Sequence, residues 1–158
     1  MKVLVIQNRM GIGDLIIFLP YIFSISKEYN TPVSLLVREN TRARELLKNN
    51  PYVSEIIILD RDDKKKAGRH QGIVGVLNLI QDLRKKNFTK SFIFNSSARY
   101  ALISKLAGIK ERYQYPLFEK KEQNIIETAK KFISVHLNKT VESNPILNID
   151  ENKVLETK

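Results

Sequence analysis

Residues 2–20 read KVLVIQNRMGIGDLIIFLP, and this stretch decides the fold. Its first part, Lys2 to Gln7, is a short β-branched run typical of a strand buried on both faces. Gly11 and Gly13 then predict a tight turn, and Asp14 opens an apolar helix that runs to about Tyr29. A strand, a glycine turn and a helix in this order are typical of the first unit of an α/β sheet.

Strands and helices alternate along the rest of the chain. Further strands are predicted at residues 33–37, 55–59, 91–95 and around 113, and helices at residues 42–48, 73–86, 98–107 and 122–137. Thr41 and Ser97 are expected to cap their helices, Gly108 to end one, and the apolar run at 55–59 to be a buried strand. The alternation predicts one α/β domain with a Rossmann-like, doubly wound parallel sheet over residues 1–144. Residues 145–158 are polar and resemble the start of a linker.

The composition favours partners that carry negative charge. The chain has 158 residues, a formal net charge of +10 and a pI near 9.8. This balance is typical of proteins that meet nucleic acid, an acidic membrane surface or a phosphorylated substrate, although a solvated lysine-rich surface has the same composition. The chain contains no cysteine, which excludes disulfides and thiolate metal sites.

Neither a membrane span nor a signal peptide is predicted. The longest apolar stretch, residues 15–23, is far shorter than the ~18–20 residues that a spanning helix needs. Gln7, Asn8 and Arg9 interrupt the N-terminal apolar run, and no small-residue cleavage site follows. We therefore expect a soluble protein whose surface can touch a membrane.

The glycine turn fits neither of two common nucleotide-binding motifs. A G-x-G-x-x-G fingerprint would need glycine where Ile16 stands, and a P-loop would need a lysine after Gly13. What remains is the carboxylate of Asp14 at the mouth of the predicted sheet. It can be an N-cap, which contributes about 1 kcal/mol. It can also be a catalytic base that the helix dipole keeps ionised, with the glycines letting a substrate come close.

Three segments resemble glycosyltransferase family 9, the ADP-heptose:lipopolysaccharide heptosyltransferases. RMGIGDLIIFLP (9–20) is similar to the family's opening motif, including the helix proline at Pro20. Residues 91–112 look like its fourth strand and following helix, and 122–137 like the last helix of its first domain. The resemblance implies the N-terminal, acceptor-side half of a two-domain GT-B fold. The nucleotide-sugar donor, expected to be ADP-heptose, would be bound by a second domain that this chain lacks, so the chain alone is expected to be inactive.

The resemblance also implies roles for individual residues. Asp14 aligns with the family's proposed general base, which takes the acceptor hydroxyl proton in an inverting reaction that needs neither metal nor cofactor. Residues matching the acceptor-binding regions include the glycine turn, the basic loop after the third strand and one arginine of the next helix: Gly11, Gly13, Arg61, Lys64, Lys65, Lys66, Arg69 and Arg99. The acceptor would be a lipopolysaccharide inner core, met in the cytoplasm at the inner face of an anionic bacterial membrane.

Two residues depart from the family pattern, and two other functions stay open. Asn95 stands where an acidic residue is frequent, and Asn124 where a histidine is frequent. A non-catalytic nucleotide-binding module would use the same sheet edge. A basic nucleic-acid-binding protein fits the charge, but the basic residues are not interleaved with aromatic ones as stacking surfaces require, so no nucleic acid is expected. His70 and His136 are expected to be accessory or structural.

Overall fold

A computed structural model describes residues 1–62, 64–117 and 124–144. Five parallel strands form one sheet in the order β3-β2-β1-β4-β5, the order of a Rossmann-type doubly wound sheet. The predicted α/β class is therefore confirmed, and the predicted linker, residues 145–158, lies outside the described residues. The elements are β1 (Val3–Ile6), α1 (Ile12–Glu28), β2 (Val33–Val37), the 3-10 turn η1 (Glu39–Thr41), α2 (Ala43–Leu46), β3 (Val53–Ile58), α3 (Gly72–Arg84), β4 (Lys90–Ile93), α4 (Ala98–Leu106), β5 (Glu111–Gln114) and α5 (Ile125–Leu137).

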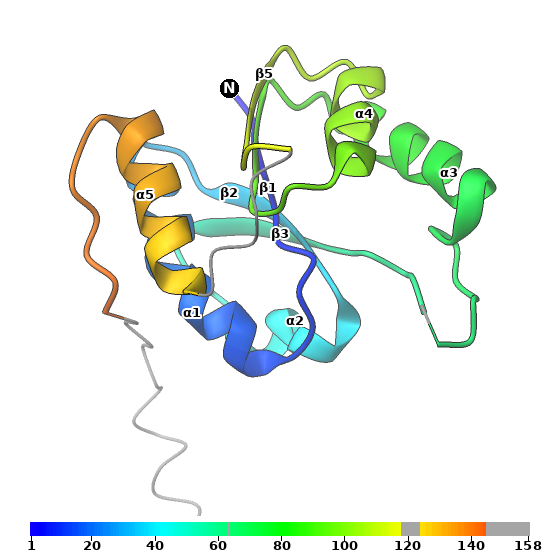
Figure 1. The fold of residues 1–158 in the computed structure, drawn as a ribbon, viewed down its shortest axis with the longest axis horizontal. Helices are drawn as coiled ribbons and strands as arrows, with labels where there is room; N and C mark the ends of the chain where they lie inside the picture. The colour runs from blue at the N-terminus through cyan, green and yellow to red at the C-terminus, as the bar shows by residue number, and fades with distance from the viewer. Residues whose placement is uncertain (63, 118–123, 145–158) are drawn as a thin grey trace, which may run out of the picture.

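Helices cover both faces of the sheet. Figure 1 shows α1 and α5 on one face and α3 and α4 on the other. Alternate residues of β1 point to opposite faces, so Val3 and Val5 join the core under α1 and α5 while Leu4 and Ile6 join the core under α3 and α4. The α1–α5 core is rich in aromatic rings, among them Phe92, Phe94 and Phe132. Two cores separated by one sheet fix the strand ends in place, and the strand ends carry the candidate site.

Two local predictions are wrong. The third strand was expected to be buried, but β3 is only partly buried because it lies at the edge of the sheet, with Ser54 and Glu55 exposed. Thr41 does not cap the following helix. Its hydroxyl donates to the Arg38 carbonyl at 2.6 Å, and α2 begins after Arg42, which has a φ of 51°. The predicted helix at 42–48 is accordingly only four residues long.

Other helix ends agree with the sequence. Ser97 is the N-cap residue of α4, although its side chain makes no capping hydrogen bond. Gly108 ends α4 with a φ of 85°, which suits glycine, and the Ile109 amide returns to the Ser104 carbonyl at 3.1 Å. Asn124 caps α5 by accepting from the amides of residues 126 and 127. The departure from the family pattern at Asn124 therefore has a structural use.

Candidate functional site at the carboxyl edge of the sheet

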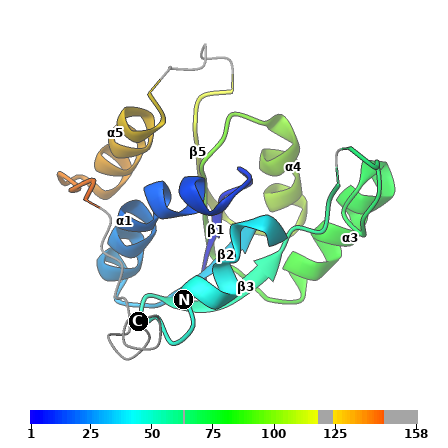
Figure 2. The ribbon, with the colours of Figure 1, turned by 90° about the horizontal axis from the view of Figure 1, so that it is seen from below.

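The site lies where the strand order reverses. The chain runs outward from β1 through β2 to β3, and then from β4 to β5 on the other side, so the crevice beyond β1 and β4 is the expected ligand position. Figure 2 looks at this edge, with the start of α1 and α2 in front of the strands. Asn8 follows β1 and Asn95 follows β4, and the Asn95 amide donates to Asn8 Oδ1 at 3.1 Å. The residue at 95 thus ties together the two loops that flank the crevice.

Asp14 lies in the first turn of α1, at this edge. The helix begins at Ile12, its N-cap is Gly11, and no side chain makes the capping hydrogen bond. The N-cap interpretation of Asp14 is therefore wrong. Its Oδ2 lies 3.9 Å from Arg9 Nη1, and both side chains are partly exposed. Asp14 is thus a carboxylate beside a guanidinium, in the first turn of a helix.

The glycine turn leaves space in front of Asp14. Gly11 has a φ of 96°, a conformation that L side chains rarely adopt, and its amide donates to Asn40 Oδ1 at 3.3 Å. Gly13 is helical, and an added Cβ at either glycine would meet nothing within 4 Å. A ligand can therefore approach the backbone at both positions. This geometry agrees with a substrate-facing turn, while acceptor binding by the two glycines stays a prediction.

A hollow of about 560 Å³ opens beside the turn, at the carboxyl ends of β2 and β3. It is lined by residues of three loops: Met10, Arg38, Glu39, Asn40, Ile58, Leu59, Asp60, Arg61, Asp62 and Lys64. Two of the predicted acceptor residues, Arg61 and Lys64, are among them. The mostly buried Arg38 joins the loops, because its Nε donates to the Asn8 carbonyl at 3.3 Å and its Nη1 to the Arg61 carbonyl at 2.9 Å.

Sequence reasoning missed Arg9, Arg38 and Asn40. Arg38 directly follows β2, and Arg9 follows β1 by three residues, so the rule that places ligands beyond the carboxyl ends of strands applies to both. The sequence prediction places only the glycine turn and the basic loop at this edge. The carboxyl edge therefore holds more cationic groups than the sequence prediction gave it.

The lysines of the basic loop are held by a tight turn. Asp62 Oδ1 accepts from the amides of Lys64 and Lys65 at 2.9 and 3.0 Å, and Lys66 has a φ of 50°. All three lysine side chains are exposed. The three ammonium groups are thus open to solvent as point charges suited to phosphate, and Lys64 also lines the hollow. The alternative of a merely solvated loop has the same geometry and stays open.

Arg69 and Arg99 are engaged within the protein. Arg69 makes a bidentate pair with Asp82, with distances of 3.0 and 2.9 Å, and Arg99 Nη2 donates to the His70 carbonyl at 2.8 Å. His70 is buried, accepts from the Asp60 amide through Nδ1 at 3.0 Å, and places Nε2 3.1 Å from Asp82. The hydrogen bond from Arg69 lowers the pKa of Asp82 to about 2. These contacts anchor the loop on α3, and an acceptor-binding role for the two arginines stays a prediction.

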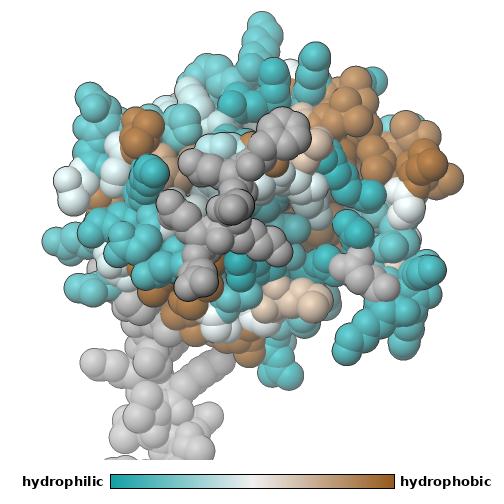
Figure 3. All heavy atoms as spheres, in the orientation of Figure 1, coloured by the Kyte–Doolittle hydropathy of each residue, from teal (hydrophilic) through white to brown (hydrophobic). Residues whose placement is uncertain are grey.

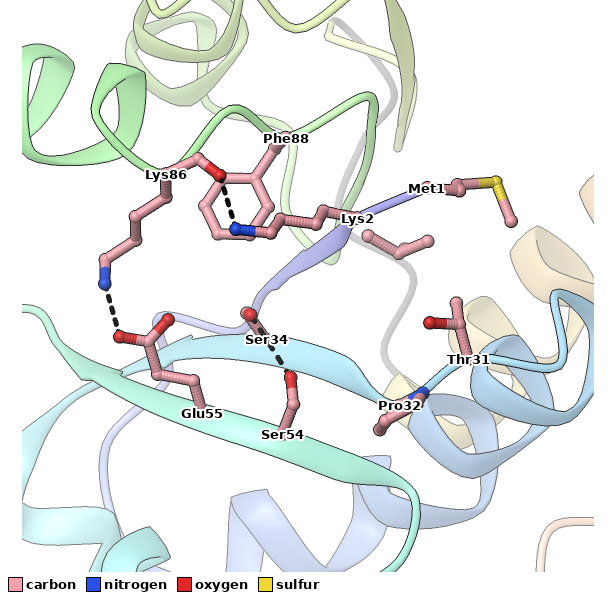
Figure 4. Close-up of a pocket in the computed structure, with 10 residues that line it drawn as sticks. Met1, Lys2, Thr31, Pro32, Ser34, Ser54, Glu55, Lys86 and Phe88 are labelled. Carbon is pink, nitrogen blue, oxygen red and sulfur yellow. Dashed lines mark hydrogen bonds and ion pairs between the residues drawn. The ribbon is translucent and has the colours of Figure 1, made fainter.

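A second hollow, of about 460 Å³, lies at the opposite edge of the sheet. Figure 4 shows residues from the amino ends of the strands around it. Its cationic side chains are already engaged: Lys86 pairs with Glu55, and Lys2 Nζ donates to the Lys86 carbonyl at 3.3 Å. Because open α/β sheets bind ligands at their carboxyl ends, this hollow is not the candidate site.

Within residues 1–62, 64–117 and 124–144, no group of three or more His, Cys, Asp or Glu side chains is placed to hold a metal ion. Among the helices described, none is long and apolar enough to cross a membrane.

The fold defines the class as a Rossmann-like α/β domain, and in such domains ligands are expected at the switch point of the sheet. No family model matches the sequence, and no curated protein matches it. Solved structures do match. A glycosyl transferase family 9 protein from Veillonella parvula is 16% identical with a TM-score of 0.68, covering 92% of this chain and 44% of its own.

Two E. coli enzymes share the same fold. ADP-heptose LPS heptosyltransferase II is 19% identical with a TM-score of 0.63, covering 99% of this chain and 49% of its own. Heptosyltransferase WaaC, solved with ADP-2-deoxy-2-fluoro heptose, is 14% identical with a TM-score of 0.64. The match covers 91% of this chain and 50% of WaaC. The chain therefore spans about half the length of the structures it matches. The predicted resemblance to glycosyltransferase family 9 is confirmed at the level of the fold.

Proposed function

We propose that this chain is the acceptor-binding half of an inverting, metal-independent glycosyltransferase. The donor is a nucleotide-sugar, ADP-heptose being the first candidate, and the acceptor is a phosphorylated lipopolysaccharide inner core. The coarse part of this proposal, a glycosyltransferase-like domain, rests on the fold of the similar structures. The donor would be bound by a further domain, since the similar chains are about twice as long.

The position of Asp14 is the observation that carries the proposal. It is an acidic side chain at the carboxyl edge, it is not used as a helix cap, and the glycines beside it leave the backbone open. In the proposed step Asp14 accepts the proton of the acceptor hydroxyl while that oxygen bonds to the anomeric carbon. The bond from that carbon to the diphosphate breaks at the same time, and ADP leaves with the electron pair.

The acceptor would lie in the hollow beside the glycine turn. Lys64 and Arg61 line this hollow, and Gly11 is hydrogen-bonded to Asn40 in its wall. The cationic groups in its lining suit the phosphates and acidic sugars of an inner-core oligosaccharide. Asp14, in the first turn of the helix that follows Met10, would meet the reacting hydroxyl. The two functions would thus be divided between two loops of one edge.

A chemical-shift titration with a Kdo-containing phosphorylated inner-core oligosaccharide tests the acceptor assignment, with ADP as the control ligand. We expect shifts at Gly13, Asp14 and residues 61–70 with the oligosaccharide and little change with ADP. Strong, localised ADP binding without an oligosaccharide response would instead favour the nucleotide-binding module.

Two variants sharpen this test. Lys64→Ala is expected to weaken oligosaccharide binding by roughly tenfold, because a charged hydrogen bond is lost. The matched control is Lys131→Ala, an exposed lysine of α5 on the other face of the sheet, which should leave binding unchanged. Equal effects of both variants would contradict a local acceptor site.

The catalytic role of Asp14 can be tested only in an active enzyme, by measuring turnover. Where the chain is joined to a donor-binding domain, Asp14→Asn should lower kcat by roughly 10²–10⁴-fold with little change in the acceptor KM. Unchanged kcat would remove Asp14 from the mechanism.

The exposed apolar side chains do not favour a site for single-stranded nucleic acid. Among the described residues, every strongly exposed large apolar side chain is aliphatic or methionine, and none is aromatic. Proteins that bind single strands stack bases on aromatic rings.

A further inference from the structure

The outer faces of α3 and α4 carry uncovered apolar side chains. Ile73, Val74 and Leu77 of α3 are 84%, 69% and 55% exposed, and Leu102 and Leu106 of α4 are 51% and 44% exposed. The opposite side of α3 is buried against the sheet through Leu79, Ile80 and Leu83. Helix α3 is thus apolar on two faces, and only one of them is packed, which marks the other as an interaction surface.

The five side chains form one surface because the two helices run side by side. At their first turns, Arg99 Nη2 donates to the carbonyls of residues 70 and 72, at 2.8 and 3.5 Å. At their last turns, Arg84 Nη2 donates to the Leu106 carbonyl at 2.6 Å. Figure 3 shows the hydrophobic side chains gathered over α3 and α4, with hydrophilic residues below them over the loop that precedes α3. We call Ile73, Val74, Leu77, Leu102 and Leu106 the aliphatic face.

Basic residues surround the aliphatic face. Lys64, Lys65 and Lys66 precede α3, Lys85 follows it, and Lys105 lies in α4 between Leu102 and Leu106. Asp82 is the only carboxylate in the sequence from Lys64 to Lys110, and it is already paired with Arg69 and His70. Basic side chains therefore outnumber acidic ones around the aliphatic face, although Asp60 and Asp62 precede the lysines in the same loop.

We propose that the aliphatic face docks on an anionic lipid bilayer. Aliphatic side chains would enter the boundary between headgroups and acyl chains, while the lysines contact the lipid phosphates. The composition separates this partner from a protein: protein interfaces are enriched in aromatic residues and arginine and depleted in lysine, whereas this surface is aliphatic and lysine-rich.

Docking in this way would also orient the molecule. The first turn of α3 follows the basic loop, which lies at the carboxyl edge of the sheet, so that edge would lie close to the headgroups. The docking proposal does not depend on the proposed glycosyl transfer. It rests on the exposed side chains and their charged surroundings.

Fluorescence of an introduced tryptophan tests the proposal, because the chain contains no tryptophan of its own. Val74→Trp places the probe on the aliphatic face. Val135→Trp is the matched control, since Val135 is a valine 67% exposed on α5, on the other face of the sheet. The probe is phosphatidylcholine vesicles with or without about 30% phosphatidylglycerol.

Only the Val74→Trp emission should shift to the blue, only with the anionic vesicles, and less as salt is raised. Flotation with the same vesicles gives the affinities. Ile73→Ser with Val74→Ser should weaken binding about tenfold or more through lost apolar burial. Replacing Lys64, Lys65 and Lys66 by alanine should weaken it on the order of 100-fold at low salt. Val135→Ser should bind as the parent does, and circular dichroism shows whether each variant is folded.

Three results would overturn the proposal. The first is a blue shift of equal size at both tryptophans, which would mean unspecific adsorption. The second is no shift of Val74→Trp with either vesicle. The third is a shift that appears with rising protein concentration and without lipid, which would assign the aliphatic face to a second copy of the chain.

Discussion

Asp82 holds the basic loop at the carboxyl edge. Its carboxylate accepts hydrogen bonds from Nε and Nη2 of Arg69 and lies 3.1 Å from His70 Nε2, so one side chain of α3 holds two neighbouring residues of the loop. His70 Nδ1 in turn accepts from the amide of Asp60, two residues after the end of β3. The loop that carries the lysines is therefore anchored at its far end by a single charge.

The pKa of Asp82 predicts how stability depends on pH. Its folded-state pKa of about 2 lies below the ordinary value of 3.8, so the carboxylate contributes stability above pH 4 that is lost as the pH falls toward 2. Asp82→Asn should lower the free energy of unfolding by about 1–2 kcal/mol at neutral pH, and by less near pH 3. Urea denaturation at both pH values measures this. The exposed Glu142, changed to Gln, is the control and should shift stability by less than about 0.5 kcal/mol.

Replacing Gln7 should stabilise the fold, whereas replacing Asp82 should destabilise it. It directly follows β1, it is fully buried, and neither amide atom of its side chain has a hydrogen-bond partner among the described residues. Because a buried unsatisfied amide is costly, Gln7→Met should raise the free energy of unfolding by about 1–2 kcal/mol. Ser26→Ala is the contrast: Ser26 is buried but donates to the Thr31 carbonyl, so its loss should destabilise. A destabilised Gln7→Met would show that the amide is satisfied.

At the scale of elements, the two glycines at the start of α1 should respond differently to alanine. Gly11→Ala should destabilise by about 1–3 kcal/mol, because its φ of 96° strains any side chain. Gly13→Ala should stabilise by roughly 0.5–1 kcal/mol, because Gly13 is helical and unobstructed. Thermal unfolding measures both effects: the Tm should fall for Gly11→Ala and rise for Gly13→Ala. If a substrate approaches Gly13, the same alanine should weaken oligosaccharide binding despite the higher stability.

The sequence predicts the helices and strands better than it predicts their burial and their contacts. Helices α3 and α5 follow from apolar periodicity, α1 from an apolar run after the glycine turn, and α4 from Ser97 and Gly108 at its ends; all of these are properties of local sequence. The burial of β3 did not, because an apolar run such as residues 55–59 reads alike in a central and an edge strand, and only the strand order decides between them. The pair of Arg9 with Asp14 and the contacts of Arg38 were also out of reach, since they depend on how separate loops meet.

For the molecule as a whole, the net charge of +10 predicts a dependence on salt. Like charges repel one another in the folded state, and raising sodium chloride from about 10 to about 150 mM shortens the range of that repulsion. The Tm should rise by about 2–4 °C. A falling Tm would mean that attractive ion pairs such as Arg69–Asp82 dominate. Measuring the Tm of Asp82→Asn at the same two salt concentrations would show how much of the fall comes from that pair.

The strand order also has a consequence for synthesis. The central strand β1 pairs with β4, and the backbone contacts at their start join Lys2 to Thr89, 87 residues apart. At ~5–20 residues per second, the ribosome needs roughly 4–17 s to make the intervening chain. During that time β1 can pair only with β2, and its other side is an open strand edge on a nascent chain. One side of the central strand thus stays unprotected until β4 has been made, and slower translation lengthens the interval in which the nascent chain is open to aggregation.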